Sequence, residues 1–289
     1  MNSKPYGRKP QPKRSLADPQ PPHVGLFISG GIGDFLALEP FFGRARGMAR
    51  TIYLATPRAE EIKQLLPYCG FGNSPKVKVV YDDFSQRDGV QSLSECIRLL
   101  TKAGKPVPPD LREAVDYSII HAFPYVAKLA HLAMQASTLM SRELAGIEPL
   151  QLPSDYLVVA PYSNNKSDPA RDFTEADWAE TLRLLSRHAR VGVVIGKGGD
   201  AVPEHPLLVN LYNRTSIAEA VEVVKGCRGY IGINSWPPTI AARKLHPDAL
   251  CVKANNPWLD KWKTVYLAPM TQFPCLAPTI EEAARAWRP

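Results

Sequence analysis

The sequence predicts an α/β protein with two parallel sheets. Short apolar runs closed by glycine or proline, which are typical of buried strands, alternate with segments whose apolar residues recur at helical spacing. This alternation forms two series, joined near residues 146–154 by a segment that contains proline. Because strands separated by helices pair in parallel, each series predicts a Rossmann-like domain. The two domains are expected to face a central cleft and to bind ligands at the carboxyl ends of their strands.

The first series begins after Pro22 with VGLFISG (24–30), an apolar run that glycines close and that predicts a buried strand. Apolar residues between positions 35 and 42 follow at helical spacing and predict a helix over 34–46. The other strands expected in this half are 51–57, 76–83 and 116–122, and the other helices are 58–66, 91–103 and 124–144.

The second series opens with the apolar run 156–161, which predicts a strand. Thr174 is placed to cap the helix that follows it over 175–188. Ser216 and Glu219 have the spacing of a capping box at the start of a second helix. The remaining expected strands are 191–196, 207–212, 229–233, 249–253 and 263–268, and the remaining helices are 216–225, 237–245 and 279–287.

Three segments follow from these patterns: an arm (1–22), an N-terminal domain (23–150) and a C-terminal domain (151–289). The arm holds five basic residues against one acidic residue, a net charge of +4, and its six prolines preclude regular structure. We therefore expect a disordered arm. Its charge fits either contact with nucleic acid or an anionic membrane, or a tail that only improves solubility.

Composition excludes several classes of protein. The 289 residues are 45% hydrophobic and 22% charged, as in globular proteins, and no apolar stretch reaches the length of a membrane span. The N-terminus lacks the apolar region of a signal peptide, so a cytoplasmic location is expected. The five cysteines and six histidines show no metal-binding spacing, and a Gly-x-Ser-x-Gly element is missing.

A glycine-rich turn follows the first expected strand, from Ser29 to Asp34. Its glycines permit close approach of a ligand at the start of a helix. A dinucleotide fingerprint would need a third glycine where Leu36 stands. Asp34 then has two readings: it caps the helix, or it acts as a general base toward a hydroxyl group.

Five segments in order resemble the lipopolysaccharide heptosyltransferases, which are inverting glycosyltransferases of the GT-B fold. They are Gly-Gly-Ile-Gly-Asp-Phe-Leu (30–36) with Pro40, 158–163 with 171–173 and Trp178, 193–196 with 199–200, 210–219, and 231–242. Together they cover roughly residues 24–270, and each lies on the strand, loop or helix expected for it.

The resemblance assigns roles to individual residues. It implies that 23–150 is the acceptor-side domain, that 151–289 binds the nucleotide sugar, and that Asp34 is the general base. Glu222 is an alternative to Glu219 at the ribose. The residues expected around the donor are Gly31, Gly33, Ser163, Asn164, Lys166, Arg171, Gly196, Glu219, Asn234, Ser235, Trp236 and Thr239.

The chain departs from the family pattern where the donor is bound. Arg171 stands in place of a lysine, and a guanidinium can grip phosphate oxygens with two hydrogen bonds. Asn234 replaces an aspartate, Trp236 a glycine, and Thr239 a histidine. The Trp236 ring either stacks on a base or sugar, or fills a pocket that has lost its function.

The resemblance implies transfer of a sugar from a nucleoside-diphosphate sugar by inverting displacement, without a metal. An ADP- or UDP-linked sugar would be the co-substrate, with no permanently bound cofactor. The acceptor would be a saccharide, a lipid-linked saccharide at the inner membrane face, or a hydroxylated DNA base, as for some viral enzymes of this fold. The rival interpretation is a non-catalytic protein that binds a nucleotide or glycan. The oligomeric state stays open.

Overall fold

A computed structural model describes part of the chain. The described residues are 23–27, 32–33, 35–36, 51–55, 58–66, 77–79, 97–98, 101–102, 104, 107, 115–118, 150–163, 169–242, 244–254 and 276–289. The expected arm, the expected helix 124–144 and the expected strand 263–268 lie outside these ranges. The expected helices 34–46 and 91–103 are described in part, and the described positions 32–33, 35–36, 97–98 and 101–102 are helical.

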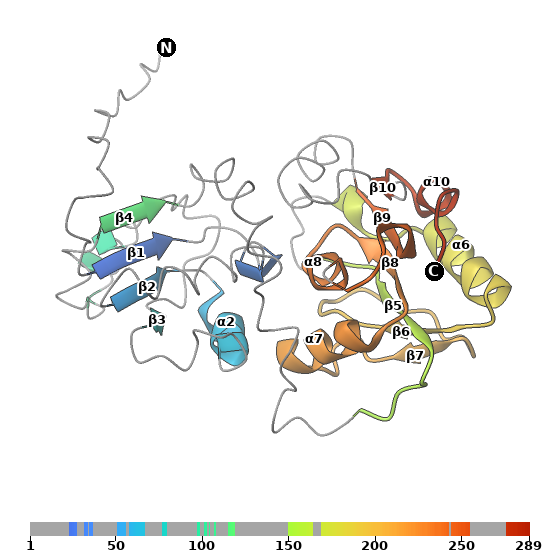
Figure 1. The fold of residues 1–289 in the computed structure, drawn as a ribbon, viewed down its shortest axis with the longest axis horizontal. Coiled ribbons are helices and arrows are strands. Elements are labelled where there is room, and N and C mark those ends of the chain that lie inside the picture. Colours follow the sequence, from blue (N-terminus) through green and yellow to red (C-terminus); the bar gives the residue numbers. More distant parts are fainter. Residues whose placement is uncertain are drawn as a thin grey trace, which may run out of the picture.

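The N-terminal half contains a four-stranded parallel sheet of order β3-β2-β1-β4 (Figure 1). Its strands are β1 (His23–Phe27), β2 (Thr51–Ala55), β3 (Val77–Val79) and β4 (Val115–Ser118). Each overlaps one of the four apolar runs from which a strand was predicted. The helix α2 (Ala59–Leu65) follows β2, within the predicted range.

The C-terminal half contains a six-stranded sheet of order β10-β9-β8-β5-β6-β7, and all of its strand pairs are parallel. Its strands are β5 (Tyr156–Ala160), β6 (Val191–Val194), β7 (Leu208–Asn210), β8 (Gly229–Ile233), β9 (Leu250–Lys253) and β10 (Leu276–Ala277). The chain builds outward from β5 to β7, returns to the centre at β8, and continues outward to β10. This is the Rossmann strand order, with its switch point between β5 and β8. The predicted α/β class with two parallel sheets is confirmed.

Continuous apolar runs form the central strands because both faces of this sheet are covered. Every residue of β5 is buried, and its side chains alternate between two cores. Val158 and Ala160 belong to the core that also contains residues of α7 and α8. Leu157 and Val159 belong to the core that contains residues of α6 and α10.

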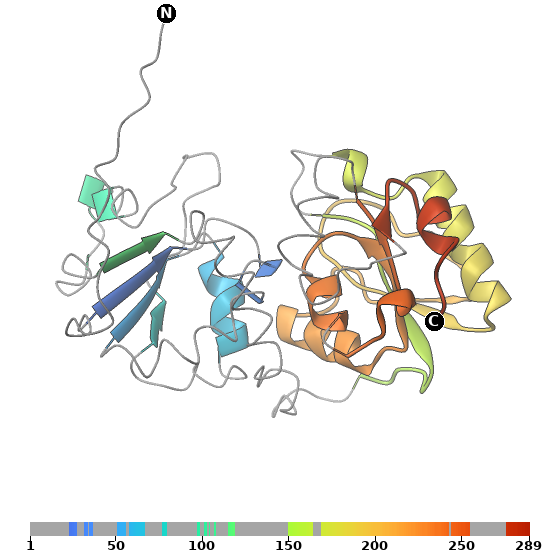
Figure 2. The same cartoon turned by 45° about the horizontal axis from the view of Figure 1, so that its top comes forward.

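The helices of the C-terminal half lie in two layers (Figures 1 and 2). The views show α7 and α8 on the side of the sheet toward the N-terminal half, and α6 and α10 on the opposite side. None of the helices among the described residues is both long and apolar enough to span a membrane. The helical elements are η4 (Pro169–Arg171), α6 (Glu175–Arg187), α7 (Ile217–Gly226), α8 (Pro237–Ala241), η5 (Pro247–Ala249) and α10 (Ile280–Ala284).

Both predicted helix starts in this half are confirmed, and both are complete capping boxes. At α6 the Thr174 hydroxyl accepts from the Asp177 N–H (3.2 Å), and the Asp177 carboxylate accepts from the Thr174 N–H (2.8 Å). At α7 the Ser216 hydroxyl accepts from the Glu219 N–H (3.2 Å), and the Glu219 carboxylate accepts from the Ser216 N–H (2.6 Å). Each box satisfies two backbone N–H groups that lack a partner within the helix.

The bounds of several elements differ from the prediction; the helix α10, for example, ends at Ala284 rather than at 287. The helix α8 ends at Ala241 rather than at 245, and in the turn that follows the N–H groups of Lys244 and Leu245 both donate to the Ala241 carbonyl (3.0 and 2.9 Å). The strand β10 was not predicted, since two residues carry no periodic signal.

The two halves share one apolar core. Phe35 and Leu36 from the segment after β1, and Ile62 and Leu65 from α2, belong to the same buried cluster as residues of α7 and α8. The helix α2 packs against α7, and the two lie side by side in both cartoon views (Figures 1 and 2). The segment after β1 is thereby held close to the carboxyl end of β8.

Candidate functional site

The switch point between β5 and β8 is where a ligand is expected to bind in a sheet of this order. Ala160 and Gly232 are register partners near the carboxyl ends of these strands. The loop after β5 leads to η4, and the loop after β8 leads to α8. Most of the predicted donor-binding residues that the structure describes lie on these two loops.

The described ends of the loop after β5 are tied to each other. The Phe173 N–H donates to the Pro161 carbonyl (3.0 Å), and the Ser163 N–H donates to the Asp172 Oδ1 atom (2.9 Å). These bonds fix Arg171, the last residue of η4, beside the end of the strand. Ser163, a predicted phosphate ligand, therefore has its backbone N–H bonded to Asp172.

Arg171 reaches across the switch point to Asn234. Its Nε atom donates to the Asn234 Oδ1 atom (3.2 Å), and its Nη2 atom donates to the Asn234 backbone carbonyl (2.8 Å). Asn234 is buried, with 3% of its surface exposed, and its own N–H donates to the Lys253 carbonyl (3.0 Å). A half-buried cation thus stands at the switch point, held by residues from two loops.

The end of β8 is held by a buried tyrosine. The Tyr230 hydroxyl donates to the Ile233 carbonyl (2.7 Å), which also accepts from the Ser235 N–H (2.8 Å). Burial raises the pKa of Tyr230 well above its ordinary value, so the hydroxyl stays protonated and donates. A Cβ at Gly232 would lie 2.5 Å from that hydroxyl, so only glycine fits there.

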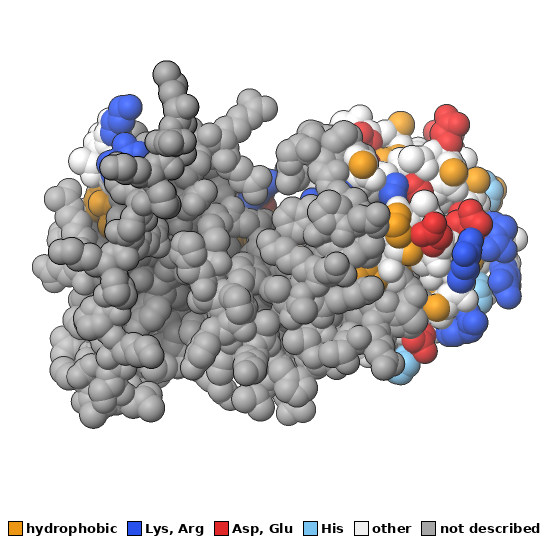
Figure 3. Space-filling model, turned by 90° about the horizontal axis from the view of Figure 1, so that it is seen from above, with side chains coloured by type: hydrophobic (Ala, Val, Ile, Leu, Met, Phe, Trp, Pro, Cys, Tyr) orange, Lys and Arg blue, Asp and Glu red, His pale blue; other side chains and the backbone are white. Residues whose placement is uncertain are grey.

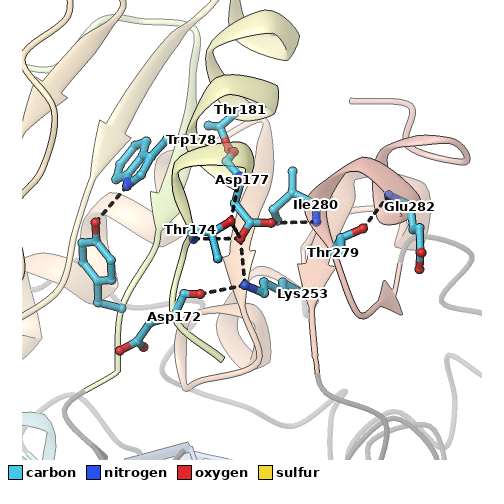
Figure 4. Close-up of polar contacts among 10 residues, drawn as sticks. Asp172, Thr174, Asp177, Trp178, Thr181, Lys253, Thr279, Ile280 and Glu282 are labelled. Atoms are coloured by element: carbon cyan, nitrogen blue, oxygen red, sulfur yellow. Dashed lines mark hydrogen bonds and ion pairs between the residues drawn. The ribbon is translucent and has the colours of Figure 1, made fainter. Parts of the chain in front are cut away.

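Below the switch point, Lys253 and Asp177 form a buried ion pair with an Nζ–Oδ2 distance of 2.7 Å (Figure 4). The Lys253 Nζ atom also donates to the Asp172 carbonyl (2.7 Å), and the Asp177 carboxylate accepts from the N–H groups of Thr174 (2.8 Å) and Ile280 (3.2 Å). Burial alone would raise the pKa of Asp177, but the hydrogen bonds outweigh it and leave the pKa below its ordinary value. The pair joins β9, α6, α10 and the loop that carries Arg171.

Gly33 brings the turn after β1 to the loop after β8. A Cβ at Gly33 would lie 3.4 Å from the Trp236 Cα atom. Trp236 is partly exposed and packs against the core that contains Phe35 and Leu36. Gly33 therefore adjoins the predicted donor site.

Thr239, on α8, is buried with 6% of its surface exposed. Among the residues that the structure describes, its hydroxyl has no hydrogen-bond partner. A buried hydroxyl without a partner costs about 1–3 kcal/mol, so a ligand group bonded there would recover that free energy.

Two other predicted residues lie on other elements of the fold, Gly196 after β6 and Glu219 on α7. Gly196 has φ 142°, and a Cβ there would lie 2.7 Å from the Tyr212 ring, so both its backbone and its neighbour require glycine. Glu219 uses one carboxylate oxygen in the capping box of α7. Glu222, the alternative to Glu219 at the ribose, is paired with Lys225.

Four predicted site residues lie outside the described residues: Gly31, Asp34, Asn164 and Lys166. Asp34, the predicted general base, is thus not described, whereas Gly33 and Phe35 on either side of it are.

The sequence analysis missed the Asp177–Lys253 pair and the Asp172 contact. Asp177 carried a signal, because it stands three residues after Thr174, the spacing of a capping box. Lys253 carried none, since a strand pattern does not reveal which carboxylate will lie at its end.

No known protein-family profile matches the chain, and no curated protein matches it. Among solved structures, the chain is similar to the iron-containing dodecameric glycosyltransferase TibC of enterotoxigenic E. coli H10407, at 15% identity and a TM-score of 0.46 over 80% of this chain. It is similar to a glycosyl transferase family 9 protein of Veillonella parvula DSM 2008, at 12% identity and a TM-score of 0.47 over 88% of this chain and 84% of that one. It is also similar to E. coli ADP-heptose LPS heptosyltransferase II, at 16% identity and a TM-score of 0.47 over 81% of this chain and 86% of that one.

The chain spans 59% of the length of TibC. One TibC structure is described as a complex with ADP-D-β-D-heptose, and a similar structure of the E. coli heptosyltransferase WaaC is described as containing ADP.

Proposed function

We propose that this chain is a glycosyltransferase that takes a sugar from a nucleoside-diphosphate sugar held at the β5–β8 switch point. The observation that carries the proposal is the Arg171 guanidinium, fixed there by two hydrogen bonds to Asn234. A fixed cation at the carboxyl ends of parallel strands suits a diphosphate, which gains negative charge as the sugar leaves. The sequence motifs that flank both strands support the same function.

The donor that we propose is an ADP-linked sugar. TibC and WaaC, which are described with ADP-D-β-D-heptose and with ADP, motivate the choice of adenine. The diphosphate would meet Arg171, with Ser163, Asn164 and Lys166 on the same loop. The sugar would lie toward Ser235, Trp236 and Thr239, on the loop and helix after β8.

The reaction that we propose is a direct displacement without a metal. The acceptor oxygen forms a bond to the anomeric carbon while the bond from that carbon to the diphosphate breaks, which inverts the configuration. Asp34 accepts the proton of the acceptor hydroxyl, and Arg171 stabilises the charge on the departing diphosphate. The contact between Gly33 and Trp236 supports this assignment, because it places the neighbour of Asp34 beside the proposed donor site.

The acceptor that we propose is a saccharide hydroxyl. The arm that motivated a DNA acceptor lies outside the described residues. On the face of the C-terminal half that Figure 3 shows, basic side chains are mixed with acidic ones among the described residues. The exposed Arg183 and Arg285, for example, pair with Glu180 and Glu281. Such a surface gives no reason to prefer a polyanion.

Thermal unfolding with a panel of nucleoside diphosphates and nucleotide sugars tests the donor. A ligand at about 100 times its dissociation constant adds ~2.7 kcal/mol to the free energy of unfolding, and we expect the largest increase with ADP compounds. Product analysis with the donor so identified then compares the wild type with Asp34→Asn. We expect the variant to bind the donor and to lose turnover. A folded protein that responds to none of the panel, or an Asp34→Asn variant with full turnover, would refute the proposal.

A further inference from the structure

The partners of Arg171 show an unusual feature: both acceptors belong to one residue, and both are neutral. The Asn234 side-chain amide oxygen accepts from Nε, and the Asn234 backbone carbonyl accepts from Nη2. Within the described part of the chain, Arg171 forms no ion pair with a carboxylate. Its orientation is therefore fixed by hydrogen bonds, while its positive charge is not balanced by them.

The geometry leaves most of the guanidinium available. Arginine has five N–H donors, and the two bonds to Asn234 use one on Nε and one on Nη2. The second Nη2 hydrogen and both Nη1 hydrogens have no acceptor among the described residues, and one hydrogen from each of these two nitrogens forms the edge of the guanidinium that suits two phosphate oxygens. The edge bound to Asn234 and the remaining edge are different, so a ligand need not displace Asn234.

Asn234 is itself firmly held. It is buried, its N–H bonds to the Lys253 carbonyl, and Lys253 in turn pairs with Asp177. The residue on either side is also fixed, because the Ile233 carbonyl accepts from both Tyr230 and Ser235. The acceptors for Arg171 thus have a rigid support from β8 and β9.

We propose that Asn234 is a positioning residue: its neutral amide holds Arg171 in place and leaves the full positive charge of the guanidinium for an anionic ligand. The inference rests on the proposed function, and it assigns Asn234 to Arg171 rather than to direct contact with the sugar. A carboxylate at this position would hold the guanidinium equally well but would cancel its charge. The amide therefore sets the charge that the site offers to a diphosphate.

The test compares Asn234→Asp and Asn234→Leu with the wild type, because the three side chains have nearly the same shape. Calorimetry measures the dissociation constant of ADP at pH 8 over a series of NaCl concentrations, and circular dichroism confirms that each variant is folded. In Asn234→Asp we expect the affinity for ADP to fall about tenfold or more, since the new carboxylate would compensate the positive charge of Arg171. We also expect the salt dependence of binding to weaken, because salt screens a smaller net charge.

Asn234→Leu separates charge from shape. It removes the side-chain acceptor and adds no charge, so we expect a smaller loss of affinity and the salt dependence of the wild type. The inference is overturned if Asn234→Asp binds ADP as tightly as the wild type, or if both variants lose affinity equally with unchanged salt dependence. If the wild type itself binds no ADP, the proposed function fails, and the inference fails with it.

Discussion

At the scale of single residues, the candidate site combines a cation held by neutral acceptors with one unsatisfied hydroxyl. Arg171 donates to two oxygen atoms of Asn234, whereas the buried Thr239 hydroxyl has no partner among the described residues. Folded proteins seldom leave a buried hydroxyl unpaired, so the exceptions mark places where a ligand or water completes the bonding. A change at Thr239 should therefore affect ligand binding without lowering the stability of the fold.

Thr239→Val should leave stability unchanged or raise it slightly, because it removes a buried polar atom that has no partner. The same change should weaken ADP or donor binding about fivefold, if the hydroxyl bonds to the ligand as a neutral group. Urea unfolding and calorimetry measure the two effects. Thr181→Val is the matched control, since Thr181 is also buried but donates to the Asp177 carbonyl (2.7 Å). The control should lose about 1 kcal/mol of stability and no affinity. A Thr239→Val variant that is destabilised as much as the control would contradict this reading.

At the scale of secondary-structure elements, the Asp177–Lys253 pair holds together the elements that carry the candidate site. It connects the start of α6, the end of β9 and the start of α10, and it holds the carbonyl next to Arg171 (Figure 4). Both side chains are almost completely buried, at 5–6% exposure, so each depends on the other for compensation of its charge.

Asp177→Asn should destabilise the protein by about 3–5 kcal/mol, because it leaves Lys253 buried without its counter-charge. Denaturant unfolding measures the change. Glu180→Gln is the control: Glu180 pairs with the exposed Arg183, and such pairs contribute about 0–1 kcal/mol. Equal losses in the two variants would show that Asp177 has no special role.

The stability that the Asp177–Lys253 pair contributes should depend on pH in the acidic range. The folded-state pKa of Asp177 lies below its unfolded value, which is about 4. Its contribution to stability is therefore fully present above about pH 4 and disappears as the pH falls through the folded-state pKa. Unfolding free energies of the wild type and Asp177→Asn, measured from pH 7 downward, should converge in that acidic range. A constant difference at all pH values would contradict the account.

The sequence predicted these elements well where the signal is local. Thr174 and Ser216 lie next to the backbone groups that they cap, so spacing alone identifies them. The contacts that make the site are not local. Arg171 and Asn234 are 63 residues apart, and Asp177 and Lys253 are 76 apart. Only the strand order brings them together, and no periodicity in the chain encodes which loop ends meet.

At the scale of the whole molecule, the close approach of Gly33 to Trp236 joins the two halves at the candidate site. The shared core beside it contains Phe35 and Leu36 from one half and residues of α7 and α8 from the other. We infer that Gly33 allows the close packing against Trp236, in addition to preceding Asp34 in the sequence.

Gly33→Val should disturb this junction. Its Cβ would lie 3.4 Å from the Trp236 Cα atom, and the two further methyl groups would overpack the contact at a cost of about 1–3 kcal/mol. The midpoint temperature of unfolding and the rate of donor turnover should both decrease. Gly199→Val is a suitable control, since a Cβ at Gly199 meets nothing within 4 Å. Unchanged stability and turnover in Gly33→Val would show that the halves do not depend on this contact.

The account as a whole depends on Arg171 as the cation that binds a nucleoside diphosphate. The most direct measurement is calorimetric titration of ADP into the wild type, Arg171→Ala and Arg183→Ala, with Arg183 as an exposed arginine on α6. Hydrogen bonds to charged groups contribute about 1.5–3 kcal/mol, so Arg171→Ala should weaken binding by roughly 10- to 100-fold, while Arg183→Ala should bind as the wild type does. Equal affinity in a folded Arg171→Ala variant would contradict the account.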